Sequence, residues 1–276
     1  MSWFNKLQHI DSKILYLLLA VVVALPLVIN FTMPVVVTPA ARGAYDAIEK
    51  LPADKLAIVD VYWAAGTSAE NKPQTEAIIR HLFMRNKKFA VLAFDVQGSQ
   101  FTDEIANRIG KEYGKVYGVD WVDWGYRPVA VEPLVIQGMA KDVIGSIVTD
   151  INGTPLKQIP IMKNVRTIKD IGLVAEITPA ETIKYWISLI HAPYRTPLIL
   201  AATSIFGPEG FNMLDAGQVD GLLVGMRGAA EYEKLLGRSD FATRGTSALS
   251  SSHLLIILLI VAGNIGYISS RRRRSG

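Results

Sequence analysis

The stretch KLAIVDVYW (residues 55–63) decides the fold of this 276-residue chain. A near-continuous apolar run of this length is typical of a strand buried on both faces, as in a parallel sheet covered by helices. Four other stretches follow the same pattern: KFAVLAFD (88–95), IGLVAEIT (171–178), TPLILAATS (196–204) and QVDGLLVG (218–225). Together they predict about five or six mostly parallel strands.

Segments with helical spacing of apolar residues lie between these strands. They are AARGAYDAIEKL (40–51), PQTEAIIRHLFMRN (73–86), SQFTDEIANRIGKEYG (99–114), LVIQGMAKDVIGSIVTDI (134–151), PAETIKYWISLIH (179–191), GFNMLDAG (210–217) and AAEYEKLLG (229–237). Alternation of strands and helices indicates helices on both faces of one sheet. The predicted fold class is therefore α/β, with a single Rossmann-like or flavodoxin-like domain.

Two uncharged stretches flank this domain. No Asp, Glu, Lys or Arg lies between Lys13 and Arg42, or between Arg244 and Arg271. Roughly 20 apolar residues span a bilayer core as a helix. The sequence therefore predicts one N-terminal and one C-terminal transmembrane helix.

Each predicted span has an alternative interpretation. The first resembles a signal peptide, but VTPAAR (37–42) is a poor cleavage site, which favours a retained anchor. The second resembles a buried core helix, but four arginines directly after it are typical of a stop-transfer segment. Both stretches are therefore interpreted as membrane anchors.

Basic residues beside the spans predict the orientation. Lys6 and Lys13 precede the first span, and Arg271 to Arg274 follow the second. Because such residues favour the cytoplasmic side, both termini are expected there, with the main domain extracytoplasmic. The expected organisation is a cytoplasmic N-terminus (1–13), a transmembrane helix (14–33), an extracytoplasmic α/β domain (34–238), a linker (239–250), a transmembrane helix (251–270) and a basic cytoplasmic tail (271–276).

Composition excludes several classes of function. Outside the anchors and tails, basic and acidic residues nearly balance, so no basic surface for nucleic acid is expected. The chain has no cysteine, which excludes disulfides and thiolate chemistry and fits a protein of the bacterial inner (plasma) membrane. The four histidines are scattered and no nucleophile motif occurs, so no catalytic residue, metal site or cofactor is expected.

Loops after the strands are where a ligand site is expected, because open parallel sheets bind ligands beyond the carboxyl ends of their strands. Glycine and serine in such turns also have purely backbone roles, and this alternative stays open. The loops are AAGTSAENKP (64–73), VQGSQ (96–100), IFGPEG (205–210) and GMRG (225–228). The candidate ligand-binding residues are Ser68, Asp95, Gln97, Ser99, Glu209, Gly225, Arg227 and Gly228.

Two further features suggest interfaces. The segment GVDWVDWGYRP (118–128) places Trp121, Trp124 and Tyr126 among charges, as an interface loop does, although aromatics also fill cores. Small residues at a spacing of four let membrane helices approach closely, and a polar amide in lipid prefers a partner. The candidate residues in the spans are Ala20, Ala24, Ala262, Asn264 and Gly266.

The chain also resembles an uncharacterised group of bacterial membrane-anchored α/β proteins of Rossmann-like type. The segments that carry the resemblance are IIRHLF (78–83), GKEYGKVYG (110–118), GTPLKQIPIMKNVRTIKDI (153–171) and GAAEYEKLLG (228–237). The resemblance implies the anchored α/β architecture. It implies no activity, because none is established for the group.

Three functions remain open. The leading hypothesis is a structural or assembly subunit of a membrane protein complex, with the lipid bilayer, copies of itself or other membrane proteins as partners. The second is a ligand-binding, sensory or transporter-auxiliary domain that uses the strand-end loops. The third is an envelope enzyme, although the sequence contains no motif for a nucleophile, a base or a cofactor.

Overall fold

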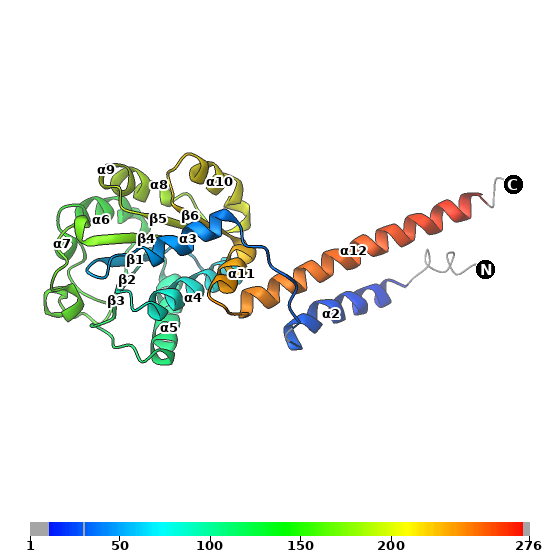
Figure 1. The fold of residues 1–276 in the computed structure, drawn as a ribbon, viewed down its shortest axis with the longest axis horizontal. Helices are drawn as coiled ribbons and strands as arrows, with labels where there is room; N and C mark the ends of the chain where they lie inside the picture. The colour runs from blue at the N-terminus through cyan, green and yellow to red at the C-terminus, as the bar shows by residue number, and fades with distance from the viewer. Residues whose placement is uncertain (1–10, 30, 273–276) are drawn as a thin grey trace. The chain divides into compact units, whose positions relative to one another are not determined.

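The structure is a computed structural model that describes residues 11–29 and 31–272 (Figure 1). It divides the chain into two compact units. The first is the α/β domain of residues 36–238, and the second contains the described residues before Val36 and after Arg238.

Six strands form one all-parallel sheet in the order β3-β2-β1-β4-β5-β6 (Figure 1). Their bounds are β1 Leu56–Val61, β2 Phe89–Ala93, β3 Trp121–Tyr126, β4 Ile171–Thr178, β5 Leu198–Ala202 and β6 Gly221–Val224. The predicted single α/β domain is confirmed. β3 forms within the segment expected to be an interface loop, because Trp121, Val122 and Trp124 bury their side chains and draw this stretch into the sheet.

The strand order creates a switch point in the middle of the sheet. The chain adds β2 and β3 on one side of β1 and then crosses to place β4 on the other side. Connections that leave in opposite directions open a crevice at the carboxyl ends of the two central strands, where α/β sheets bind ligands. The carboxyl ends of β1 and β4 are therefore the first place to look for a site.

Helices cover both faces of the sheet. One core lies under α3 Pro39–Glu49, α4 Ser68–Met84, α5 Val96–Glu112 and α11 Gly225–Leu235. The other lies under α6 Glu132–Met139, α7 Val143–Ile147, α8 Ile183–Trp186 and α10 Gly207–Asp215. Side chains alternate along β1, so that Ile58 enters the α6–α8 core and Val59 the α3–α4 core.

Two predicted helices differ in the structure. The helix expected over residues 134–151 is divided into α6 and α7, because Asp142 caps α7 by accepting a hydrogen bond from Gly145 N at 2.9 Å. The helix expected from Pro179 begins instead at Ile183 and continues through a π-helical turn, Ile187–His191, into α9 Ala192–Tyr194.

The second unit contains α2 Ser12–Val28 and α12 Phe241–Arg272. In α12, residues 241–268 are long and apolar enough to span a bilayer. The most apolar 18 residues of this segment have a mean hydropathy of 2.0, and only 11% of them are buried. The N-terminal span expected over residues 14–33 is not supported, since α2 has 17 residues and residues 31–38 form no helix. The segment expected to be a linker (239–250) is helical from Phe241 onward.

Helices α2 and α12 pack side by side in this unit (Figure 1). Met33 N, just beyond α2, donates a hydrogen bond to Ser247 Oγ of α12 at 2.9 Å. The end of α2 therefore lies beside the first turns of α12, and the two helices are antiparallel.

Candidate functional site

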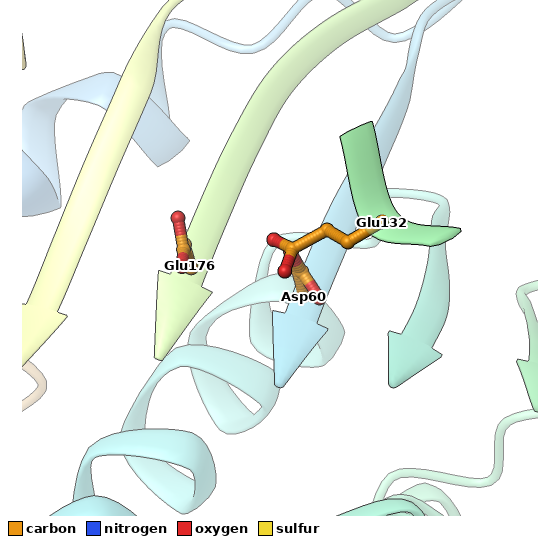
Figure 2. Close-up of side chains that lie close together, drawn as sticks. All are labelled: Asp60, Glu132 and Glu176. Atoms are coloured by element: carbon orange, nitrogen blue, oxygen red, sulfur yellow. The ribbon is translucent and has the colours of Figure 1, made fainter. Parts of the chain in front are cut away.

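Two acidic residues lie opposite each other at the switch point. Asp60 of β1 and Glu176 of β4 are paired in the sheet register, close to the carboxyl ends of their strands (Figure 2). Both follow the alternation that points Ile58 and Val174 into the α6–α8 core, and both are fully buried. Like charges directly opposite on one sheet face repel each other, so this pair has an electrostatic cost.

Glu132 completes the cluster. It is the first residue of α6, reached through the turn after β3, and its side chain extends toward Asp60 (Figure 2). It is also fully buried. One oxygen from each of Asp60, Glu132 and Glu176 lies within 4.8 Å of the others, and these three residues are called the carboxylate cluster below.

Hydrogen bonds satisfy only part of the carboxylate cluster. Trp186 Nε1 donates to Asp60 Oδ2 at 2.5 Å, and Thr182 Oγ1 donates to Glu176 Oε1. The buried oxygens without a hydrogen-bond partner are Asp60 Oδ1, Glu132 Oε1, Glu132 Oε2 and Glu176 Oε2. A buried polar atom without a partner costs about 1–3 kcal/mol, and more when it is charged.

The electrostatics agree with this geometry. Burial raises the pKa of Asp60, and burial together with the charge of Asp60 raises the pKa of Glu132. Burial raises the pKa of Glu176 as well, and the charges of Asp60 and Glu132 add to that rise. Among the described residues, the charges that contribute to these shifts are those of the cluster itself. The cluster is therefore suited to a positively charged ligand.

The sequence did not predict these three residues. The sequence did contain a signal: Asp60 and Glu176 are single acids within otherwise apolar strands. Because both faces of such strands are buried, an acid there is unusual. Their adjacency depends on the strand order and register. The placement of Glu132 depends on the path after β3, which no local pattern fixes. The expectation of no metal site rested on the scattered histidines and the absence of cysteine, and it stays an expectation.

Three predicted loop residues bond to the backbone of the loops after β1 and β2. Asp95 caps α5 by accepting hydrogen bonds from Gln97 N and Gly98 N at 2.8 and 2.9 Å. Gln97 Oε1 accepts one from Ala65 N at 2.9 Å, and Ser68 Oγ donates to Ala65 O at 2.8 Å. These contacts join the loops after β1 and β2 and give the three side chains backbone-supporting roles.

The other predicted loop residues are divided between the start of α5 and the loops after β5 and β6. Ser99 is buried in the first turn of α5, and Glu209 is exposed at the start of α10. Arg227 pairs with Glu231 at 3.1 Å, and its exposed side chain lines a cavity of about 350 Å³ that also touches Gly228. The cavity does not include Ser68, so the structure does not bring Arg227 and Ser68 together.

Two glycines at this edge permit close packing. Gly225 has a φ of +59°, and a Cβ there would meet Ser204 Oγ at 2.1 Å. At Gly228 a Cβ would meet the backbone of Leu223 at 2.8 Å. Backbone conformation and close packing therefore explain why glycine occupies both positions in the turn from β6 to α11.

The aromatic segment is divided between core and surface. Trp121 packs with Phe83 and Phe89 in the core under α3–α5, and Trp124 lies in the opposite core. Both indoles are buried, while Tyr126 is 39% exposed. Of the three predicted interface residues, the structure leaves Tyr126 accessible to a partner.

The candidate residues of the apolar helices lie on different sides. Ala20 and Ala24 are exposed on α2. On α12, Ala262 is half-buried and Gly266 is buried within the helix pair, whereas Asn264 is exposed. Asn264 Nδ2 donates to Ile260 O of its own helix at 2.9 Å.

No protein-family model, curated protein or solved structure matches this chain. No activity, ligand or partner therefore comes from a relative. The resemblance to membrane-anchored α/β proteins of unknown activity stays an expectation.

Proposed function

We propose that this chain is a membrane-anchored binding domain that holds its ligand at the switch point of the sheet. The carboxylate cluster is the observation that carries this proposal. Three buried acids with unpartnered oxygens destabilise a fold, and a purely structural domain has no need of them. Groups that lower stability are retained where binding needs them.

Stability of the ligand-free chain tests this function without knowledge of the ligand. Replacing one acid of the carboxylate cluster by its neutral isostere, Glu132→Gln, removes at nearly constant volume a buried acid that must either carry a charge or take up a proton when the chain folds. We expect it to raise the free energy of unfolding by about 1–3 kcal/mol. The measurement is urea denaturation of the full chain in detergent with EDTA, followed by tryptophan fluorescence.

Glu49→Gln is the matched control, because Glu49 is an acid whose carboxylate has donors in the same domain. This change should lower the free energy of unfolding by about 1–2 kcal/mol. If Glu132→Gln lowers stability as Glu49→Gln does, the carboxylate cluster is structural and the binding function fails.

The anchor is α12, with α2 packed along it. The proposed location is a bacterial inner membrane, with both ends of the chain cytoplasmic and the α/β domain extracytoplasmic. Antiparallel packing of α2 on α12 supports a common side for the two ends, and Lys13 and the arginines from Arg271 favour the cytoplasm. Protease protection in sealed vesicles tests the orientation, and cleavage of the α/β domain from the cytoplasmic side would refute it.

Assembly with copies of itself or with other membrane proteins is a second candidate function. It is favoured by the outer side of α2, where Ala20 and Ala24 are exposed at a spacing that allows close approach of another helix. Mass photometry in detergent should show a species larger than the monomer. Ala20→Leu with Ala24→Leu should reduce that species, and Val21→Leu, also exposed on α2, should not. A monomer at all concentrations would contradict assembly through copies of itself.

A further inference from the structure

The carboxylate cluster permits a statement about the class of its ligand, which rests on the binding function proposed above. We propose that Asp60, Glu132 and Glu176 bind one hard divalent cation of the class of Ca²⁺, Mn²⁺ and Mg²⁺. The three carboxylates are its protein ligands (Figure 2).

The donor atoms select the class of ion. The cluster offers carboxylate oxygens alone, without imidazole nitrogen or thiolate sulfur. Such donors suit Ca²⁺, Mg²⁺ and Mn²⁺, while Zn²⁺ and Cu²⁺ prefer sites that include nitrogen or sulfur. An organic cation would instead need space beside the acids, whereas Asp60, Glu132 and Glu176 are all fully buried.

The spacing of the oxygens is compatible with one ion bound by all three residues. Two ligands on opposite sides of an ion lie at most twice the metal–oxygen distance apart, which is about 4.2 Å for Mg²⁺ and about 4.6–5.2 Å for Ca²⁺. The ligand oxygens of the cluster lie within 4.8 Å of one another. They are therefore close enough together to coordinate one ion.

Hydrogen bonds leave the appropriate atoms available. Trp186 and Thr182 each occupy one oxygen, on Asp60 and Glu176 respectively, and fix the orientation of these two carboxylates. The second oxygen of each remains free, as do both oxygens of Glu132. Donors behind metal-binding groups commonly orient them in this way. Glu132 is suited to bidentate coordination, for which Ca²⁺ has a preference.

Charge gives a further reason for an ion. Three ionised carboxylates in a buried site repel one another, and a divalent ion reduces their net charge from −3 to −1. The competing state is a cluster that shares protons and binds no metal. A metal titration of the purified chain distinguishes the two states, because the ionised cluster binds the ion and the proton-sharing cluster does not.

Mn²⁺ titration of the full chain in detergent, after treatment with EDTA and its removal, tests the inference. Binding is followed by loss of the electron paramagnetic resonance signal of free Mn²⁺. We expect one saturable ion per chain, displaced by Ca²⁺. Glu132→Gln should weaken binding by at least about tenfold.

Asp123→Asn is the matched control. Asp123 is another fully buried acid in the same sheet, with an unpartnered Oδ2, but it lies on β3 and outside the carboxylate cluster. This variant should bind Mn²⁺ as the wild type does. Equal weakening by Asp123→Asn and Glu132→Gln would overturn the assignment of the site.

Absence of saturable Mn²⁺ and Ca²⁺ binding by the wild type overturns the inference, whether or not the variants fold. The proposed binding function is tested separately, by the stability of Glu132→Gln in the metal-free chain. If Glu132→Gln stabilises the metal-free chain while the wild type binds no metal, the carboxylate cluster serves another positively charged ligand. If Glu132→Gln destabilises the metal-free chain, the binding function itself is wrong.

Discussion

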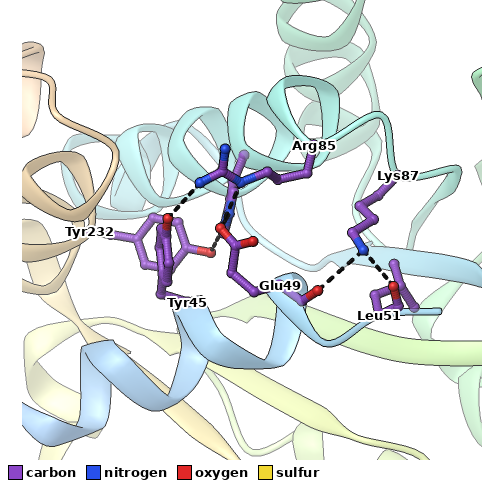
Figure 3. Close-up of polar contacts among 7 residues, drawn as sticks. Tyr45, Glu49, Leu51, Arg85, Lys87 and Tyr232 are labelled. Atoms are coloured by element: carbon purple, nitrogen blue, oxygen red, sulfur yellow. Dashed lines mark hydrogen bonds and ion pairs between the residues drawn. The ribbon is translucent and has the colours of Figure 1, made fainter. Parts of the chain in front are cut away.

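Two buried polar clusters lie on opposite faces of the same sheet and differ in how their atoms are satisfied. On the α6–α8 face, the carboxylate cluster leaves four oxygens without partners. On the α3–α4 face, Tyr45, Glu49, His81, Arg85 and Tyr232 bond to one another, and they are called the histidine cluster here (Figure 3). The contrast therefore lies between the two clusters: no buried side-chain atom of the histidine cluster is without a partner, whereas the carboxylate cluster has four such oxygens.

The histidine cluster joins three helices. His81 of α4 is fully buried, with Nδ1 at 2.7 Å from Tyr232 Oη of α11 and Nε2 at 3.1 Å from Glu49 Oε1 of α3. With Glu49 ionised, Nε2–H donates to the carboxylate and Nδ1 accepts from Tyr232. Arg85 reaches Glu49 and Tyr45 from outside (Figure 3). A satisfied network of this kind stabilises the packing of helices, whereas the carboxylate cluster destabilises its surroundings until a ligand binds.

The largest effect that tests this contrast is expected from His81→Ala. The ring stacks on Tyr45 with centroids 4.4 Å apart and is the partner of Tyr232 Oη. Its removal leaves a cavity and an unpartnered buried hydroxyl, so the free energy of unfolding should fall by about 3–4 kcal/mol. Urea denaturation of the full chain in detergent measures this. A loss below about 1 kcal/mol would mean that the histidine cluster is no more structural than the carboxylate cluster.

A smaller effect is expected from acid. Burial lowers the pKa of His81 to about 4, although Glu49 opposes this shift, while Arg85 and Lys87 add to it. The folded state then binds fewer protons than the unfolded state below about pH 6.5, so stability should fall as pH decreases from about 6.5 to about 4. The contribution of His81 over this window is about 2–3 kcal/mol.

Comparison with His81→Gln isolates this titration. Thermal or urea unfolding of both chains is measured across the window, and the difference between them removes the contribution of other groups. Burial raises the pKa of Glu49, but interactions with Tyr45, Arg85 and His81 outweigh it and lower that pKa to about 2, so the effect of Glu49 lies mainly below pH 4.5. Parallel pH profiles for the wild type and His81→Gln would show that folding leaves the pKa of His81 unchanged, which contradicts this prediction.

The contrast also shows what the sequence could and could not reveal. The apolar runs around Asp60 and Glu176 predicted β1 and β4 correctly, because burial on both faces leaves a clear local pattern. The same runs do not say that the two strands are neighbours or that these acids share a register position. His81 resembled an ordinary residue beside basic neighbours on a helix, since its partners come from α3 and α11. Local pattern predicts elements, while both clusters depend on long-range contacts.

The smallest effect is expected from Arg85→Ala, at the outer edge of the histidine cluster. Arg85 Nε lies 2.6 Å from Glu49 Oε1, but the side chains of Arg85 and Glu49 are 42% and 34% exposed. Solvent screens such a pair, so the free energy of unfolding should fall by only about 0.5 kcal/mol. Because salt at 1 M shortens the screening length to about 3 Å, the loss should shrink further in 1 M NaCl. A double-mutant cycle with Glu49→Gln measures the coupling energy between Arg85 and Glu49. A value above about 2 kcal/mol would mean that this exposed ion pair, and not the buried ring of His81, is the main source of stability in the cluster.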